Sequence, residues 1–319
     1  MNKVIIGCLV ISFLANIFFF VDSFSNQKNL VDQPAIQYPY LARRIFAESP
    51  NDVIINFVPL RQKLREYVVV KEGKIGIFFE YLPTGIGIGV NDREAFFRAS
   101  LVKVPGVMSA YKLIEEGKLT RREQLTVQEY HLDSDYGSLW QQGAGTTISV
   151  EEAMRLSLVE SDNTAYEVLN EKINEILDAD IGEEQNIDDV YDYLDILRDE
   201  EGLTQEITPR NYSSILRSLF FSAYLSYENS NELLDILTRT AYIQGITKSL
   251  PDSVKVAHKF GIHNVEPGNL DVHSDCGIIY FPQRPYILCV MVASGDEART
   301  SKYIQEISRM VYDYISGVN

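Results

Sequence analysis

The stretch FFRASLVKVPGVMSAYKLIEEGKL, residues 96–119, lies where strand-like sequence gives way to helix-like sequence. Gly117 ends the helical pattern. Ser100 and Lys103 stand one turn apart at the start of the predicted helix, so their side chains project to the same side. The apolar residues recur with the i, i+3, i+4, i+7 spacing of a helix that has one buried side: Leu101, Val104, Val107, Met108, Tyr111 and Ile114.

Strand-like segments occur at both ends of the sequence, with helical segments between them. Lys74–Leu82 and Gly85–Val90 resemble a β-hairpin, and three further strand-like runs lie within residues 253–294. Residues 118–250 have helical character, and a last helix is predicted over Ala298–Ser316. We therefore expect an α/β (α+β) two-lobe fold. One antiparallel sheet, built from N- and C-terminal segments and flanked by helices, would lie beside an all-helical lobe, and a site would form in the cleft between them.

The composition indicates a globular body and excludes one class of partner. Hydrophobic residues make up 45% of the 319 residues, which is enough for a full core. The formal net charge of −16 repels phosphate backbones, so nucleic acid is not expected as a partner. We expect a monomer.

The N-terminus carries an apolar run, Val4–Phe24, preceded by Lys3. About 20 apolar residues can span a bilayer, and a preceding positive charge keeps the N-terminus inside. The alternatives are a cleaved signal peptide and lipidation at Cys8. We expect residues 1–24 to be an anchor or signal, residues 25–58 a stalk, and residues 59–319 a membrane-anchored, extracytoplasmic body that opens with a short helix at Pro59.

The cysteines of the body, Cys276 and Cys289, lie in two apolar runs around a proline-containing turn. A hairpin centred near Gln283 would place them on neighbouring strands but not opposite each other, so two free core thiols are expected. No Cys-x-x-Cys or His-x-x-His spacing occurs, so no metal site is expected.

Three short motifs follow one another in order. Ser100-x-x-Lys103 opens a helix, Ser161-Asp162-Asn163 precedes another helix, and Lys259-Phe260-Gly261 lies on a predicted strand. Together they resemble the serine β-lactamase and penicillin-binding protein superfamily, nearest to its class A branch, whose motifs are Ser-x-x-Lys, Ser-Asp-Asn and Lys-Thr-Gly. The resemblance covers the chain from about Leu60 onward and implies a two-lobe fold and an acyl-enzyme mechanism without a cofactor.

The motif residues would supply a nucleophile, its base and a proton relay. Ser100 would attack a carbonyl carbon, and an unaided hydroxyl needs a base beside it. Lys103 would be that base, because burial and the second cation of Lys259 would both lower its pKa. Ser161 would relay a proton to the leaving group.

Other residues would bind the substrate. Asn163 would hold a substrate amide, Lys259 would supply charge, and Gly261 would leave room for substrate along the strand edge. By analogy with the family, the backbone N–H groups of Ser100 and Ile262 would form the oxyanion hole. Tyr136 and Trp140 are candidates for the cleft mouth.

The sequence departs from class A β-lactamases in two places. Those enzymes carry a glutamate that activates the deacylating water in a loop before a Thr-Pro pair. The segment before Thr208 is too short for that loop. Its acidic candidates are Glu200, Glu201 and Glu206, and we expect them to be solvated surface residues. Phe260 replaces a hydroxyl residue that helps bind a substrate carboxylate.

These features predict a serine hydrolase that forms an acyl-enzyme and releases it slowly. The expected substrates are β-lactams. The alternatives are a D-alanyl-D-alanine peptidase that acts on cell-wall peptide, and a catalytically weak, membrane-anchored binding protein.

Overall fold

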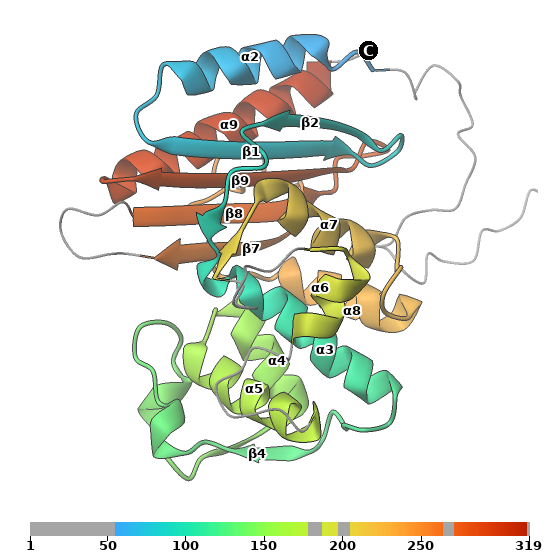
Figure 1. The fold of residues 1–319 in the computed structure, drawn as a ribbon, viewed down its shortest axis with the longest axis vertical. Helices are drawn as coiled ribbons and strands as arrows, with labels where there is room; N and C mark the ends of the chain where they lie inside the picture. The colour runs from blue at the N-terminus through green and yellow to red at the C-terminus, as the bar shows by residue number, and fades with distance from the viewer. Residues whose placement is uncertain (1–54, 178–186, 197–204, 264–270, 318–319) are drawn as a thin grey trace, which may run out of the picture. The chain divides into compact units, whose positions relative to one another are not determined.

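The computed structural model describes residues 55–177, 187–196, 205–263 and 271–317 of the chain. A five-stranded antiparallel sheet has the order β2-β1-β9-β8-β7 (Figure 1). Segments from both ends of the sequence build it, as predicted. The strands are β1 (Lys74–Tyr81), β2 (Ile86–Val90), β7 (Val256–His263), β8 (Asp271–Ile279) and β9 (Tyr286–Ser294).

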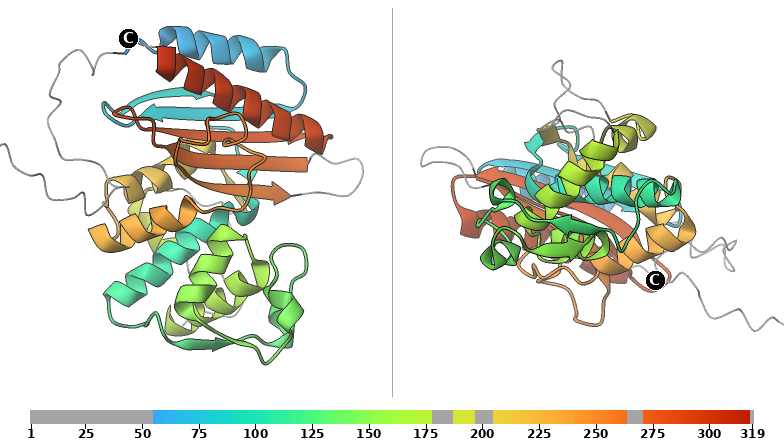
Figure 2. Two further views of the ribbon diagram at one scale, coloured as in Figure 1. Left: turned by 180° about the vertical axis from the view of Figure 1, so that it is seen from behind. Right: turned by 90° about the horizontal axis from the view of Figure 1, so that it is seen from below.

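Two helices cover one face of the sheet. Helices α2 (Val58–Val69) and α9 (Glu297–Gly317) pack against each other and against the strands (Figures 1 and 2). On the other face, α7 (Pro209–Phe220) packs against β1, β8 and β9. Because both faces are covered, β9 is buried at every position and reads as a continuous apolar run.

The other helices form the second lobe. Helix α3 (Lys103–Glu115) is central to it, since ten of its thirteen residues are buried. The structure also contains two short antiparallel strand pairs, β3 with β6 and β4 with β5, which the helical prediction did not foresee. The remaining elements are α4 (Val150–Val159), α5 (Asn163–Leu177), α6 (Asp188–Tyr193), α8 (Tyr227–Leu237), β3 (Phe96–Phe97), β4 (Gln124–Thr126), β5 (Thr147–Ser149) and β6 (Glu206–Ile207).

Local sequence explains where these helices begin. The Ser149 hydroxyl accepts a hydrogen bond from the Glu152 N–H and caps α4. Thr208 caps α7 in the same way, and Pro209 occupies its first turn, where no N–H is needed. The antiparallel sheet and the separate helical lobe together confirm the expected two-lobe fold.

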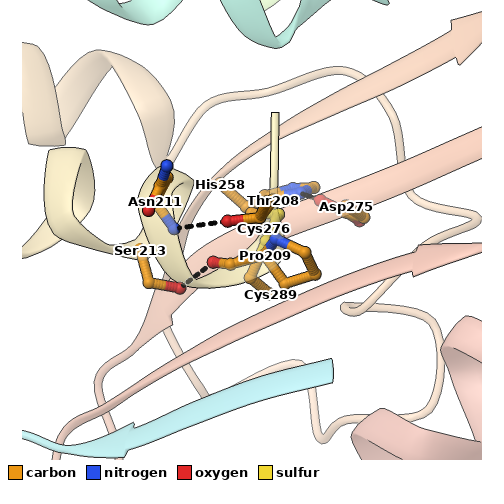
Figure 3. Close-up of a disulfide and its surroundings, with 8 residues drawn as sticks. All are labelled: Thr208, Pro209, Asn211, Ser213, His258, Asp275, Cys276 and Cys289. Atoms are coloured by element: carbon orange, nitrogen blue, oxygen red, sulfur yellow. Dashed lines mark hydrogen bonds and ion pairs between the residues drawn. A yellow bond between two sulfur atoms is a disulfide. The ribbon is translucent and has the colours of Figure 1, made fainter. Parts of the chain in front are cut away.

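The expectation of two free thiols is wrong. Cys276 and Cys289 form a disulfide between β8 and β9, beside the start of α7 (Figure 3). The hairpin closes at the pair Ile279–Tyr286, so its centre lies between Pro282 and Gln283. That half-residue difference from a centre at Gln283 brings the two cysteines directly opposite each other.

The apolar run Val4–Phe24 and nearly all of the predicted stalk lie outside the described residues. Within the described ranges, no helix combines the length and the apolar character that crossing a membrane requires.

Candidate active site

A strained turn presents Ser100. Ala99 has a φ of +44°, and Ala99–Val102 form a 3₁₀ turn that leads into α3. The turn is held from both sides, because the Arg98 N–H donates to the Gln205 carbonyl at 2.9 Å and β7 runs against it. A non-glycine residue with positive φ persists only where its surroundings enforce it, and such residues cluster at functional sites.

Gly261 allows β7 to approach this turn. A Cβ at that position would lie 3.0 Å from the Arg98 carbonyl oxygen and 3.3 Å from the Ala99 Cβ. The glycine therefore makes room for the turn that carries Ser100, and its role in leaving room for substrate stays a prediction.

Lys103 is buried among acceptors. Its side chain is 3% exposed, and its Nζ donates to the Ser161 carbonyl at 2.6 Å and to Asn163 Oδ1 at 2.5 Å. Burial lowers the pKa of Lys103 to about 7, although the nearby carboxylates of Asp162 and Glu167 act in the opposite direction. A substantial fraction of Lys103 is therefore a neutral amine at neutral pH.

Ser161 connects the two lysines of the motifs. Lys259 is fully buried, and its Nζ donates to Ser161 Oγ at 2.7 Å and to the Phe260 carbonyl at 3.0 Å. Lys103 Nζ lies 3.5 Å from the same hydroxyl. Burial lowers the pKa of Lys259, and the charge of Lys103 lowers it further. The Ser161 hydroxyl thus lies between two amines that can exchange protons with it.

Asp162, the middle residue of the second motif, holds the loop and not a substrate. Its Oδ2 accepts hydrogen bonds from the N–H groups of Ser138 and Leu139, at 2.7 and 2.8 Å. Its Oδ1 accepts from the Ala165 N–H at 2.8 Å, at the start of α5. Both carboxylate oxygens are engaged, so this side chain fixes the position of its neighbours Ser161 and Asn163.

A cavity of about 850 Å³ opens beside Ser100. Four predicted site residues line it, namely Ser100, Lys103, Asn163 and Ile262, whereas Ser161, Lys259 and Gly261 do not. Tyr136 lines it as expected, but Trp140 does not. The lining residues that the sequence did not single out for this site are Phe97, Arg98, Ala99, Val102, Asp133, Asp135, Tyr166, Glu167, Asn170 and His263.

Phe260 does not line this cavity. Its ring stacks on Tyr242, with centroids 4.3 Å apart, and lies 5.9 Å from the ring of Tyr136. Lys259 Nζ lies 4.2 Å from the centroid of the Phe260 ring. Phe260 is only 4% exposed, so it is a packing residue in an aromatic cluster that supports Lys259.

The glutamate sought before Thr208 has no counterpart among the described residues of that segment. Glu200 and Glu201 lie outside the described residues, and Glu206 pairs with Phe97 in a short strand and is exposed. The cavity instead contains Glu167, four residues after Asn163 on α5. The spacing Asn163, Glu167, Asn170 was a usable signal, because positions i, i+4 and i+7 share one helix face.

Comparisons with known proteins agree with this arrangement. The sequence model described as "Beta-lactamase enzyme family" matches residues 59–315. The curated beta-lactamase VEB-1 of Pseudomonas aeruginosa is 22% identical over 284 residues, which are 80% of this chain and 90% of that protein.

Solved structures share the fold. PBP-A is 24% identical with a TM-score of 0.70, covering 81% of this chain and 96% of its own. A beta-lactamase from Chitinophaga pinensis is 22% identical with a TM-score of 0.70, covering 80% of this chain and 98% of its own. A variant of PBP-A has been solved as an acyl-enzyme complex with penicillin G.

Proposed function

The chain belongs to the beta-lactamase enzyme family as a serine β-lactamase-like hydrolase, and we propose that Ser100 is the nucleophile with which it opens β-lactam rings. The observation that carries the proposal is Lys103, a buried amine with a pKa lowered to about 7 that shares a cavity with Ser100. A neutral amine one helical turn away can accept the hydroxyl proton as Ser100 attacks.

The acylation step uses the residues around that pair. Ser100 Oγ bonds to the lactam carbonyl carbon while its proton passes to Lys103. The N–H groups of Ser100 and Ile262 stabilise the resulting oxyanion. The C–N bond then breaks, and the Ser161 hydroxyl gives its proton to the leaving nitrogen. Lys259 Nζ, 2.7 Å from Ser161 Oγ, stabilises the negative charge that develops on this oxygen. Protonated Lys103 then gives its proton to Ser161 Oγ, which restores the hydroxyl and the neutral amine.

Acylation is expected to be faster than deacylation. Lys103 and Lys259 both lie within hydrogen-bonding range of the Ser161 hydroxyl, so the groups needed to form the acyl-enzyme are in place. Hydrolysis of the ester needs a base for water, and the loop glutamate that supplies it in class A β-lactamases has no counterpart among the described residues before Thr208. The acyl-enzyme should therefore accumulate.

A fluorescent penicillin tests the proposal. The full-length protein in detergent micelles would be mixed with the label, and the adduct would be followed by intact mass. We expect one penicillin mass on Ser100, which clears over minutes, and none in Ser100→Ala. A wild-type protein that never carries the adduct would overturn the proposal, and an adduct that clears within seconds would overturn slow deacylation.

A D-alanyl-D-alanine peptidase is the second candidate, favoured by the acidic side of the cavity. Asp133, Asp135 and Glu167 line it and would repel the carboxylate of a β-lactam while attracting an amine of a cell-wall peptide. Release of D-alanine from an amine-bearing peptide would be compared with its N-acetylated form. Equal rates for the two peptides would contradict this preference.

We propose that the body lies outside the cytoplasm and is anchored by residues 1–24. Two features support this location: the apolar run Val4–Phe24 and the disulfide between Cys276 and Cys289, which persists in oxidising compartments. Membrane fractionation, combined with the mass of the mature N-terminus, tests it. A protein recovered in the soluble fraction with residues 1–24 removed would show a cleaved signal.

A further inference from the structure

Helix α5 carries a polar stripe into the cavity. Asn163, Glu167 and Asn170 are spaced i, i+4, i+7 and all line the cavity beside Ser100. The opposite side of the same helix is apolar and buried, as its residues Ala165, Val168, Leu169 and Ile173 show. The stripe therefore presents two amides and one carboxylate to whatever occupies the cavity.

Glu167 is close to Lys103 without being tied to it. Each residue perturbs the other: the charge of Lys103 lowers the pKa of Glu167, while desolvation raises it more strongly. Within the described part of the chain, the Glu167 carboxylate forms no hydrogen bond and no ion pair. Its oxygens are free to accept a proton from a bound molecule.

The other carboxylates near Ser100 are less suitable. Asp162 uses both oxygens on backbone N–H groups. Asp133 Oδ1 accepts from the Asp135 N–H at 2.8 Å and thereby shapes the loop that carries both residues. Glu167 stands instead on a helix, directly after Tyr166, which also lines the cavity. The Glu167 carboxylate forms no hydrogen bond and no ion pair within the described residues, and its backbone is fixed in the helix. Asp135 also lines the cavity, but it stands on a loop.

Asn170 supplies a second observation. Its Oδ1 is buried and, among the described residues, has no hydrogen-bond partner. A buried acceptor without a partner indicates a place where a water molecule binds. Because Asn170 is three residues after Glu167, the two side chains are neighbours on the helix surface.

We propose that Glu167 is the general base for hydrolysis of the Ser100 acyl-enzyme and that Asn170 holds the water it activates. The inference rests on the proposed function, because it needs an acyl-enzyme. Glu167 takes a proton from water as the water oxygen bonds to the ester carbon. The C–Oγ bond then breaks, Ser100 Oγ recovers the proton from Glu167, and a carboxylic acid product leaves.

The test separates acylation from deacylation. Full-length wild-type protein, Glu167→Gln and Glu175→Gln would be mixed with penicillin, and the Ser100 adduct would be followed over time by intact mass. Glu175 is the matched control, since it lies on the same helix, is exposed, and pairs only with Lys172 among the described residues. We expect Glu167→Gln to deacylate about 100-fold more slowly than wild type, which is typical of losing a general base, and to change the acylation rate far less than the deacylation rate.

Two further measurements keep the test decisive. Glu167→Asp, which retains a carboxylate, should recover part of the deacylation rate. The wild-type deacylation rate should rise with pH as a carboxyl group ionises, and Glu167→Gln should lose that rise. Thermal unfolding of each variant reports whether it is folded.

Each remaining outcome overturns the inference. If Glu167→Gln deacylates like the wild type, Glu167 is not the base. If acylation and deacylation slow equally in Glu167→Gln, Glu167 acts only through its effect on Lys103. If the wild type carries no adduct on Ser100, the proposed function fails together with the inference, and that result is distinct from an adduct whose lifetime the substitution leaves unchanged.

Discussion

Lys103 has two strong acceptors and little access to water, so its protonation state is set by the protein. Because the pKa of Lys103 is lowered to about 7, the amine loses its proton as the pH rises through that value and can then act as a base. Arginine keeps its charge at any relevant pH and therefore cannot replace Lys103.

The acylation rate should therefore rise with pH between about 6 and 8 and then become constant. Lys103→Arg should acylate about 100-fold or more slowly, in line with the loss of a general base. Stopped-flow measurement with a chromogenic cephalosporin between pH 5.5 and 9 checks both. Lys112→Arg, on the exposed side of the same helix, serves as the control and should match the wild type. A rate that does not change across this pH range would contradict the assignment.

Phe260 occupies a motif position at which the family has a hydroxyl, but its ring is built into a stack with Tyr242. Phe260→Thr should therefore lower the free energy of unfolding by about 3 kcal/mol, because it removes a buried ring, and it should not increase the acylation rate. Urea unfolding and the acylation assay measure the two effects. Phe221→Thr, at an exposed ring, should change stability by less than about 0.5 kcal/mol. A Phe260→Thr protein that is as stable as wild type and acylates faster would show that the ring is not a packing element.

At the scale of elements, the site depends on how closely the edge strand β7 approaches the Ser100 turn. β7 supplies Lys259, Gly261 and Ile262, the turn supplies Ser100, and α3 begins directly after it with Lys103. The relative position of these two elements sets the distance between the lysines and the nucleophile.

Gly261→Ala should push the strand and the turn apart. The added methyl group would meet the Arg98 carbonyl oxygen at 3.0 Å and Leu101 Cγ at 3.2 Å, which is closer than ordinary contacts. We expect acylation to slow at least about tenfold, since a small misplacement of reacting groups is costly, with a smaller loss of thermal stability. Gly295→Ala, where a Cβ meets nothing within 4 Å, is the control. Unchanged acylation in Gly261→Ala would show that the strand can shift without consequence.

At the scale of the whole molecule, the sequence allowed the elements and the three motifs to be predicted. It did not allow the exact strand register or the side-chain packing to be predicted. Periodicity located the sheet strands and α3, and the order of the motifs indicated which lysine and serine residues meet. The disulfide depended on half a residue in the β8–β9 hairpin, which apolar patterning does not resolve. The orientation of Phe260 depended on Tyr242, a residue that only packing brings near it. Glu167 was missed because the sequence of an amphipathic helix does not show which of its solvent-facing charged residues lies beside a cavity.

The disulfide connects the two central strands β8 and β9, and its cysteines lie in the same cross-strand row as Lys259. A cross-link that closes a segment of 13 residues stabilises a fold by about 3 kcal/mol, chiefly by restricting the unfolded chain. The double variant Cys276→Ala/Cys289→Ala should therefore unfold roughly 5–10 °C lower. Acylation at 25 °C should stay within about threefold of wild type, because neither cysteine lines the cavity. Differential scanning calorimetry and the penicillin assay measure the two effects, with Cys8→Ala as a control that should leave the melting temperature unchanged. If the double variant melts like wild type but acylates much more slowly, the disulfide positions Lys259 and does not stabilise the sheet.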